Sequence, residues 1–331
     1  MEGKIALEEH VSTEEHMQVW DRAQEAARNG KEYMKAVEHQ LLNSEHRIEQ
    51  MDEHGIGTAI VAMTANSAQG IPDPKKAVEF AKRTNDLIAD NYARRYAGRL
   101  YAFATVALQN PRAAADELER AVRDLGMKGA MIYGYSNIGD TQTGQYLDEA
   151  PVWEFWERVA GLNVPIYLHP REPLPNQRRI YEGYPALIGS AWGFAHETGT
   201  HAVRLMLSGL FDRYPKLQII LGHLGEGLPH LLPRLEWRLY KQHDGFGAKG
   251  LKKKVSEYFS ENFYVTTSGH FNTKTLLNAL AEIGVDRMMF SVDYPYEDIK
   301  DAATWFDHAL LSENDRHRIG RENARRLFDL P

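Results

Sequence analysis

The segment at residues 58–63 reads Thr-Ala-Ile-Val-Ala-Met, and the segment at residues 218–221 reads Gln-Ile-Ile-Leu. Their apolar residues are nearly continuous instead of alternating with polar ones, which is typical of parallel strands covered on both faces. Further short, β-rich apolar segments lie at residues 4–8, 101–108, 129–133, 165–168, 262–267 and 287–292. Together these segments predict eight buried strands.

Helices are predicted between these strands. Asp73-Pro74 and Asn110-Pro111 each place a capping side chain before a proline at the first helical position, where proline is well tolerated. Eight strands that alternate with helices, without a linker rich in Pro, Gly or Ser, fit a closed (β/α)8 TIM barrel better than two open sheets. We therefore expect an α/β fold in a single domain that spans residues 1–331.

Three stretches are longer than simple barrel loops. Residues 11–40 are charged and exceed what a crossover after the first strand requires, so we interpret them as a helical lid or interface insertion. Residues 135–148 are rich in Gly, Thr, Asp and Asn, and residues 171–189 contain three prolines. We expect both of these stretches to hang, as irregular loops, over one face of the barrel.

The composition excludes several classes of protein. The chain has 331 residues, 43% of them apolar, and its net charge of −7 gives no attraction to nucleic acids. No apolar segment approaches the ~18 residues of a membrane helix, and Glu2 and Lys4 stand where a signal peptide would be apolar, so a cytoplasmic protein is expected. Because the chain has no cysteine, any metal must bind His, Asp or Glu.

Ionisable residues follow four of the predicted strands at their carboxyl ends, where barrel enzymes carry their catalytic groups. The first strand leads into Glu8-Glu9-His10, and the fifth, sixth and eighth lead into His169, His223 and Asp293. Because side chains alternate across a strand, Glu8 and His10 are predicted to share one face while Glu9 points to the other.

Four of these residues fit a metal site. A mixed set of carboxylates and imidazoles suits zinc or manganese, and the set consists of Glu8, His10, His169 and Asp293. Any one of them alone is most simply an ordinary polar residue at a strand end. Burying several carboxylates together without a cation is costly, so four such residues at one end of a barrel favour a divalent ion.

Two other motifs carry less weight. His196 and His201 resemble the histidines of a zinc-protease helix, but that motif needs a spacing of four residues and the spacing here is five. The segment at residues 222–227 reads Gly-His-Leu-Gly-Glu-Gly, which does not match the spacing of a dinucleotide fingerprint. We interpret it as a tight turn in the active site.

The strand-end segments resemble those of the amidohydrolase superfamily, in particular its branch of aromatic-acid decarboxylases. The matching segments lie at residues 3–10, 167–171, 221–226, 290–295 and 319–328. Within the branch, His169-Pro170-Arg171 together with Ile180-Tyr181 is most similar to the γ-resorcylate (2,6-dihydroxybenzoate) decarboxylases, and the 5-carboxyvanillate decarboxylases come next.

The resemblance implies a metal-dependent, non-oxidative decarboxylase of an ortho-hydroxybenzoate, which releases CO2 and a phenol without an organic cofactor. It assigns the metal, manganese in some members and zinc in others, to the same four ligands. The sequence departs from the hydrolytic members at two points. Glu8 stands in place of the first histidine of their His-x-His pair, and the nearest candidate for a bridging lysine, Lys128, precedes the fourth strand, so one ion per subunit is expected.

The resemblance also places His223 and Glu226 beside the metal. We expect Asp293 to receive the phenol proton of the bound substrate and pass it to the ring carbon that carries the carboxylate. His223, oriented by Glu226, would stabilise the charge that develops on the substrate.

Three residues are carried over as substrate contacts. Phe194 is expected to wall the substrate ring. Arg47 and Arg234 are expected to contact the carboxylate or a phenol oxygen, either within one subunit or across a subunit interface. Either arginine is equally consistent with a surface ion pair, the usual role of arginine on a helix. We expect a homodimer or homotetramer.

Two alternatives stay open from the sequence. The first is a metal-dependent hydrolase of an ester, lactone or amide on the same barrel, which would use a metal-bound hydroxide. The second is a catalytically silent member that acts as a binding or scaffold protein.

Overall fold

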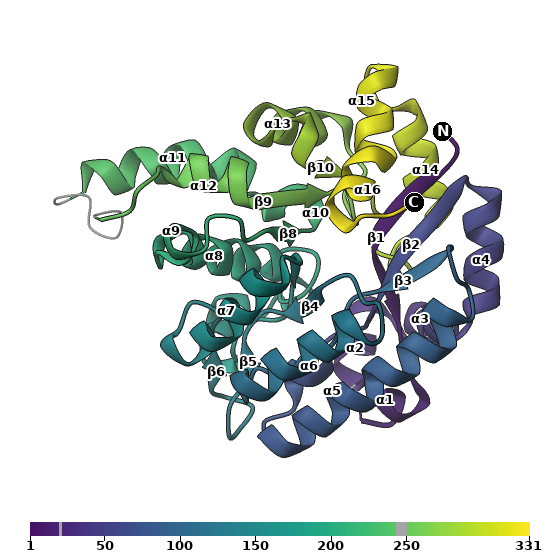
Figure 1. Cartoon of the computed structure of the whole chain (residues 1–331), viewed down its shortest axis with the longest axis horizontal. Coiled ribbons are helices and arrows are strands. Elements are labelled where there is room, and N and C mark those ends of the chain that lie inside the picture. Colours follow the sequence, from purple (N-terminus) through teal and green to yellow (C-terminus); the bar gives the residue numbers. More distant parts are fainter. Residues whose placement is uncertain (20–21, 243–249) are drawn as a thin grey trace.

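The computed structural model describes residues 1–19, 22–242 and 250–331 (Figure 1). Eight short parallel strands overlap the eight predicted segments, so the predicted number and order of strands are confirmed. They are β1 (Lys4–Val11), β2 (Ile56–Met63), β3 (Leu100–Ala102), β4 (Ala130–Tyr133), β7 (Ile166–His169), β8 (Ile219–Leu221), β9 (Phe263–Thr266) and β10 (Met288–Met289).

Two parallel sheets close into one barrel. Their strand orders are β1-β2-β3 and β10-β9-β8-β7-β4. A parallel bridge between Ala104 and Ala130 joins β3 to β4, and a second bridge between Glu9 and Tyr294 joins β1 to the segment after β10. The backbone N–H of His10 donates to the carbonyl of Tyr294 at 2.6 Å across the second junction. The predicted (β/α)8 fold is therefore confirmed.

Helices separate the strands and begin with the predicted caps. The Asp73 carboxylate accepts from Lys76 N at 2.9 Å, and the Asn110 side chain accepts from Ala113 N at 3.1 Å. The helices are α1 (Glu14–Val19), α2 (Arg22–Asn29), α3 (Lys31–Leu42), α4 (Ser44–Glu53), α5 (Pro74–Ile88), α6 (Pro111–Arg123), α7 (Trp153–Leu162), α8 (Gly193–Leu207), α9 (Leu210–Arg213), α10 (His223–Glu226), α11 (Leu228–Lys241), α12 (Val255–Asn262), α13 (Thr273–Ile283), α14 (Ile299–His308), α15 (Glu313–His317) and α16 (Asn323–Phe328).

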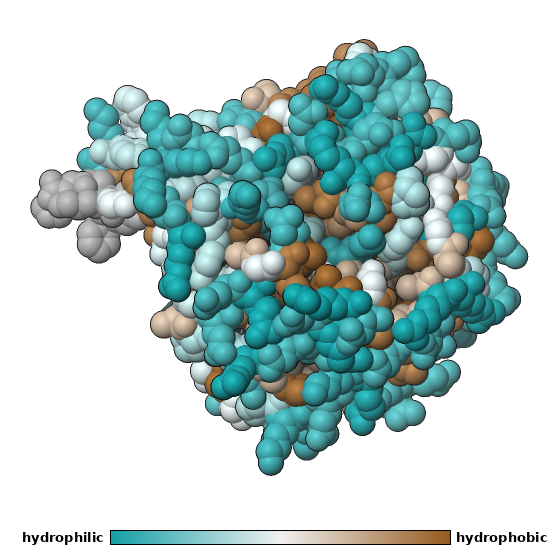
Figure 2. Space-filling view, viewed as in Figure 1, coloured by the Kyte–Doolittle hydropathy of each residue, from teal (hydrophilic) through white to brown (hydrophobic). Residues whose placement is uncertain are grey.

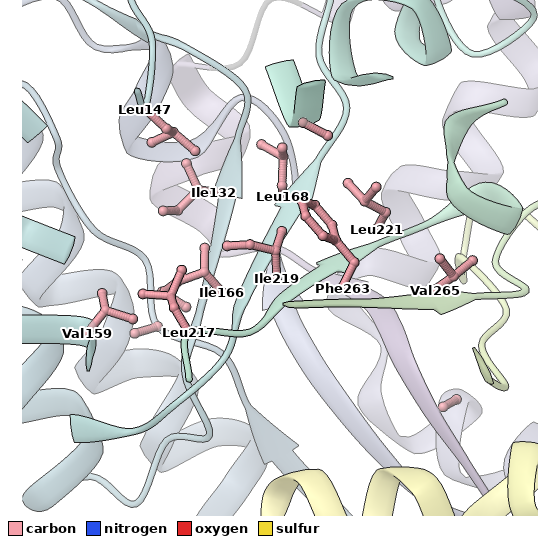
Figure 3. Packing of buried hydrophobic residues seen from close by; sticks show 14 of the residues in the cluster. Ile132, Leu147, Val159, Ile166, Leu168, Leu217, Ile219, Leu221, Phe263 and Val265 are labelled. Atoms are coloured by element: carbon pink, nitrogen blue, oxygen red, sulfur yellow. The ribbon is translucent and has the colours of Figure 1, made fainter. Parts of the chain in front are cut away.

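Strand side chains divide between two apolar cores. In β8, Ile219 and Leu221 belong to the larger core between barrel and helices, whereas Ile220 belongs to the core inside the barrel. The same division in β7 puts Ile166 and Leu168 in the outer core, part of which is seen in Figure 3, and Tyr167 in the inner one. Both faces of each strand are thus covered, which explains the nearly continuous apolar segments.

The insertion after β1 is helical, as predicted, although its residues 20 and 21 lie outside the described ranges. Helix α3 packs on the loop after β10, where Met34 and Val37 form an apolar cluster with Tyr296. The Tyr33 hydroxyl donates to the carbonyl of Tyr296 at 2.7 Å. On the other side of the insertion, Arg28 of α2 forms an ion pair with Glu172, which follows β7.

Two expectations about local structure are wrong. The stretch at 135–148 is not wholly irregular, because β5 (Ser136–Asn137) and β6 (Gly144–Gln145) pair as an antiparallel hairpin within it. The third strand ends at Ala102, well before residue 108, although the apolar residues that follow are buried. The apolar residues after Ala102 are buried by side-chain packing and do not pair as a strand. Their hydrophobicity predicts that they are buried, but it does not predict which of these two structures buries them.

The visible surface is mostly hydrophilic, with hydrophobic residues in small separate patches (Figure 2). Helices α11 and α12 project from one side of the barrel (Figure 1). In the described part of the chain, no helix combines the length and apolar character that crossing a membrane requires.

Candidate active site

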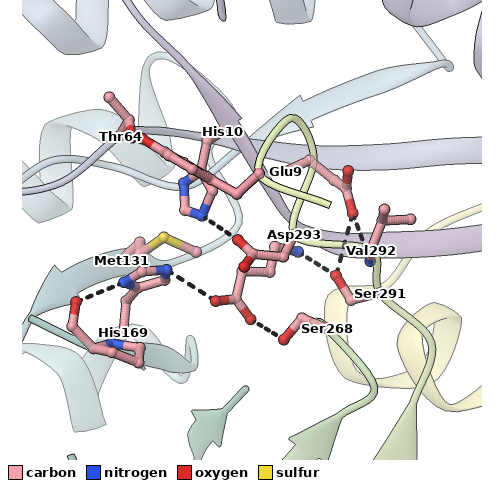
Figure 4. Close-up of polar contacts among 12 residues, drawn as sticks. Glu9, His10, Thr64, Met131, His169, Ser268, Ser291, Val292 and Asp293 are labelled. Carbon is pink, nitrogen blue, oxygen red and sulfur yellow. Dashed lines mark hydrogen bonds and ion pairs between the residues drawn. The ribbon is translucent and has the colours of Figure 1, made fainter. Parts of the chain in front are cut away.

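Four ionisable side chains meet at the carboxyl ends of the barrel strands. Each offers one ligand atom, and all four atoms lie within 4.8 Å of one another. The cluster consists of Glu8, His10, His169 and Asp293. The structure therefore brings together the residues of the predicted ligand set, three of them buried and Asp293 partly exposed. Figure 4 shows the polar contacts of His10, His169 and Asp293.

His169 points its Nε2 atom at Glu8. Its Nδ1 lies 2.8 Å from the carbonyl of Pro170, and since a carbonyl only accepts, Nδ1 carries the proton. The other ring nitrogen, Nε2, lies 2.9 Å from Glu8 Oε1. Both atoms are buried without a hydrogen-bond partner among the described residues. An imidazole nitrogen and a carboxylate oxygen are both common metal-ligand atoms, so their close approach inside a buried cluster suits a shared cation.

His10 is oriented in the same way. The Tyr133 hydroxyl donates to the carbonyl of Met63 and lies 3.2 Å from His10 Nδ1, so it accepts the Nδ1 proton. His10 Nε2 then faces Asp293 Oδ1 at 3.0 Å. Burial lowers the pKa of His10, although hydrogen bonding to Asp293 partly opposes this, and the neutral imidazole is the form that binds metals.

Glu8 is held ionised at the centre of the cluster. Its Oε2 accepts hydrogen bonds from the hydroxyls of Tyr167 and Ser268. Burial raises the pKa of Glu8, but the imidazoles of His223 and His169 outweigh that effect and hold the pKa well below its ordinary value. Its other oxygen, Oε1, is left for a ligand.

The predicted tight turn after β8 places His223 at the edge of the cluster. Residues 223–227 all have positive φ, between 51° and 85°. His223 Nδ1 lies 2.7 Å from Glu226 Oε1, and its Nε2 lies 3.5 Å from Asp293 Oδ2. Burial lowers the pKa of His223, but the carboxylates of Glu226 and Glu8 and the hydrogen bond to Asp293 together raise it well above its ordinary value. His223 is therefore a cationic donor beside the cluster.

Asp293 connects the cluster to solvent. Its backbone is left-handed, with φ 81°, and its N–H donates to the carbonyl of Glu8 at 2.9 Å. Its Oδ1 faces His10 and its Oδ2 faces His223. With 14% of its side chain exposed, Asp293 can exchange a proton with a bound molecule.

Glu9 points away from the cluster, as predicted. Its Oε1 accepts from Val292 N at 3.0 Å and from the Ser291 hydroxyl at 3.2 Å (Figure 4). Burial raises the pKa of Glu9 to about 8, although the nearby Arg47 partly opposes the shift. Glu9 thus ties the end of β1 to the segment after β10.

Arg47 is not a surface ion pair. It is 1% exposed, donates to the carbonyl of His10 and lies over the ring of Tyr294, 4.5 Å from its centre. Its Nη1 lies 4.0 Å from Glu9 Oε2, on the outer side of β1. The structure therefore places Arg47 behind the ligands, and its contact with a substrate stays a prediction.

The other two predicted substrate contacts lie on α8 and α11. Phe194 is half-buried in the first turn of α8, the helix that packs against the turn of His223, where Gly199 approaches the Glu226 carbonyl. Arg234 is exposed on α11. Neither residue is among the four clustered ligands, so both roles stay predictions.

Three hydroxyl groups around Glu8 were missed by sequence reasoning. Tyr167 lies inside a strand that reads as apolar, and the end of β9 provides the uncharged Thr266 and Ser268. One signal was available: Tyr167 stands two residues before His169 and so faces the barrel interior with it.

The rejected motifs are confirmed as structural. His201 is fully buried, and its Nε2 accepts from Leu147 N at 2.9 Å, whereas His196 is exposed. Lys128 donates to the carbonyl of Phe328 at 3.1 Å, at the amino end of β4. In the described ranges, the four-residue cluster is the one candidate metal site found.

Comparison with known proteins agrees with this geometry. The Amidohydrolase family profile matches residues 15–330. The chain is 48% identical to a gamma-resorcylate decarboxylase of Rhizobium radiobacter over 333 aligned residues, which cover 100% of this chain and 99% of the relative. The alignment therefore covers almost the full length of both proteins.

Two solved structures are similar over the same length. One is a dihydroxybenzoic acid decarboxylase from Polaromonas sp. JS666 with bound manganese and the inhibitor 2-nitroresorcinol, with a TM-score of 0.94, 46% identity and coverage of 100% of this chain and 98% of that one. The other is a 5-carboxyvanillate decarboxylase from Sphingomonas paucimobilis, with a TM-score of 0.89, 29% identity and full coverage of both chains.

Proposed function

Because the chain belongs to the amidohydrolase family, we propose that it is a metal-dependent, non-oxidative decarboxylase of an ortho-hydroxybenzoate such as 2,6-dihydroxybenzoate. The observation that carries the proposal is the buried pair Glu8 Oε1 and His169 Nε2, two potential ligand atoms 2.9 Å apart inside a four-residue cluster. Two relatives that match this chain along its full length are named a gamma-resorcylate decarboxylase and a dihydroxybenzoic acid decarboxylase.

One divalent ion, Mn2+ or Zn2+, fits the donor set of Glu8, His10, His169 and Asp293. When bound, it would hold the carboxylate and the adjacent phenol oxygen of the substrate and draw electron density from them. The protein's own residues account for the proton transfers. No organic cofactor is needed for this chemistry.

Asp293 is the proton carrier in this proposal. It accepts the proton of the substrate phenol and returns it to the ring carbon that bears the carboxylate. The carbon–carbon bond then breaks, its electron pair restores the aromatic ring, and CO2 leaves. His223, held by Glu226 at 2.7 Å, donates toward the negative charge on the substrate.

We also propose three substrate contacts. Phe194 walls the ring, and Arg47 and Arg234 act on the carboxylate or a phenol oxygen. Arg234 lies on α11 near Leu231 and Trp237, which are 51% and 61% exposed. Large exposed apolar residues on a projecting helix support a homodimer or homotetramer in which Arg234 serves a neighbouring subunit.

The organisation of the chain is part of the proposal. We regard residues 1–331 as one domain and the insertion at 11–40 as a lid, since Tyr33 contacts Tyr296, three residues after Asp293. The cytoplasmic location expected from the sequence stays a prediction.

The test compares metal-free protein with protein reloaded with Mn2+ or Zn2+. Each form is incubated with 2,6-dihydroxybenzoate and other ortho-hydroxybenzoates while the absorbance of the acid is followed and the products are separated. We expect metal-dependent formation of the phenol, resorcinol in the case of 2,6-dihydroxybenzoate. Release of a carboxylic acid from esters, lactones or amides, with no decarboxylation, would instead establish a hydrolase.

A further inference from the structure

Three hydroxyl groups surround one oxygen of Glu8, the carboxylate at the centre of the cluster. Tyr167 and Ser268 both donate to Glu8 Oε2. Thr266 lies between them, with its Oγ1 2.8 Å from the Tyr167 hydroxyl and 3.0 Å from Ser268 Oγ. These residues come from β7, from β9 and from just after β9, so the group joins three strands of the barrel when β1 is included.

The proton positions in this group follow from chemistry. A carboxylate only accepts, so Tyr167 and Ser268 must each point their single hydroxyl proton at Glu8. Ser268 Oγ in turn accepts from the backbone N–H of His223 at 3.1 Å. The hydroxyl network therefore links Glu8 to the turn that carries His223.

Gly222 closes the remaining side of Glu8 Oε2. A Cβ atom at this position would lie 2.4 Å from Glu8 Oε2 and 2.8 Å from Ser268 Oγ. The backbone thus packs close to the bonded oxygen, and there is no space for a side chain at residue 222. Glu8 Oε1, in contrast, is buried without a hydrogen-bond partner in the described structure and faces His169.

We propose that the hydroxyls of Tyr167, Thr266 and Ser268 form a clamp that makes Glu8 a one-oxygen metal ligand, through Oε1 alone. The clamp residues are positioning residues. They keep Oε2 away from the ion, so that coordination positions stay open for both oxygens of an ortho-hydroxybenzoate. This inference rests on the proposed function, because it presumes the metal.

The test measures Mn2+ dissociation constants of folded, metal-free protein by calorimetry and by the electron paramagnetic resonance signal of free Mn2+. Tyr167→Phe and Ser268→Ala are each expected to weaken binding by about 10- to 100-fold, the usual effect of removing a group that supports a ligand. Thr266→Val, which keeps both donors to Glu8, is expected to weaken it less.

Helix α12 offers matched controls, because the same two kinds of hydrogen bond occur there with partners outside the cluster. The Tyr258 hydroxyl donates to Asp212, and Ser256 Oγ donates to Glu236 at 2.5 Å. Tyr258→Phe and Ser256→Ala should lower stability without changing the Mn2+ affinity. The Tm of each metal-free variant separates a loss of stability from a loss of affinity.

The outcomes distinguish the clamp from the proposed function. If wild-type protein binds Mn2+ and the clamp variants bind it equally well, the clamp is wrong and the metal site stands. If wild-type protein binds no divalent ion, both are wrong. Should one of Tyr167→Phe and Ser268→Ala not fold, an unchanged Mn2+ affinity in the other variant overturns the clamp.

Discussion

Glu8 and Glu9 are neighbours in the chain, yet they lie in two regions of the molecule with opposite chemistry. Glu8 faces the barrel interior, where hydroxyls and imidazoles keep it ionised and leave one oxygen free. Glu9 faces the outer side of β1, where burial raises its pKa to about 8 and the surrounding groups anchor the strand. The inner face carries the proposed chemistry, and the outer face holds the inner face in place.

A buried glutamate is therefore not identified as a metal ligand by its residue type alone. Both carboxylates are buried and both have cationic neighbours. What separates them is the set of atoms left unsatisfied: Glu8 Oε1 has no hydrogen-bond partner, whereas Glu9 Oε1 accepts from a backbone N–H. An unpaired buried oxygen implies a missing partner, and on the inner face that partner is a cation.

The largest difference in Mn2+ binding and turnover is expected between the variants Glu8→Gln and Glu9→Gln. Loss of the central ligand should abolish stoichiometric Mn2+ binding and all measurable turnover, as should His169→Ala. Glu9→Gln should bind Mn2+ as wild type does, because Glu9 contributes no ligand atom. Metal content by mass spectrometry and decarboxylation rates check this pair, and equal metal loss in both variants would refute the division of roles.

A smaller effect is expected from Asp293→Asn. The amide can still offer an oxygen to the metal, with reduced affinity, but it cannot carry a proton, so turnover should fall by about 10²- to 10⁴-fold. Rates measured at saturating Mn2+ separate the two contributions. Full activity in Asp293→Asn would end the proposed proton transfer.

On the outer face, Arg47→Met should act on stability. It removes a buried donor and leaves the His10 carbonyl without this hydrogen bond, which is expected to cost about 1–3 kcal/mol of unfolding free energy. The Mn2+ dissociation constant of the folded variant should be unchanged. The KM for 2,6-dihydroxybenzoate decides the predicted substrate contact: a raised KM supports it, and an unchanged KM removes it.

The smallest effect is the pH dependence of folding stability that Glu9 contributes. Because the pKa of Glu9 is raised to about 8 in the native state, that state holds the proton more tightly than the unfolded chain does. The contribution of Glu9 to stability is therefore present at low pH and is lost as the pH rises from the ordinary carboxyl range through about 8. Glu9→Gln removes this dependence.

Thermal unfolding at a series of pH values measures the effect. The Tm of Glu9→Gln minus the Tm of wild type should increase by a few degrees as the pH rises from about 5 to about 9. A difference in Tm that does not vary with pH would contradict the raised pKa of Glu9.

The barrel and the four residues of the cluster could be predicted from the sequence, for physical reasons. Strands covered on both faces must be apolar throughout, so segments such as 58–63 stand out, and the residues that end them are forced to one face of the barrel. The alternation of side chains was enough to separate Glu8 from Glu9. These features depend on the pattern of residues within short segments of the chain.

The features that could not be predicted depend on contacts between distant segments. Arg47 looks like an ordinary helix-surface arginine, and its burial follows from the packing of α4 against the end of β1. The clamp residues Tyr167, Thr266 and Ser268 carry no charge and meet Glu8 through the closed barrel. The β5–β6 hairpin has short polar strands with no apolar pattern.

The central claim is that one divalent ion on the inner face of the barrel supports decarboxylation. The most direct measurement titrates metal-free protein with Mn2+ while CO2 release from 2,6-dihydroxybenzoate is recorded. The rate should rise in proportion to added metal and reach its plateau at one ion per chain. Decarboxylation by metal-free protein, or a plateau only at two ions per chain, would contradict the account.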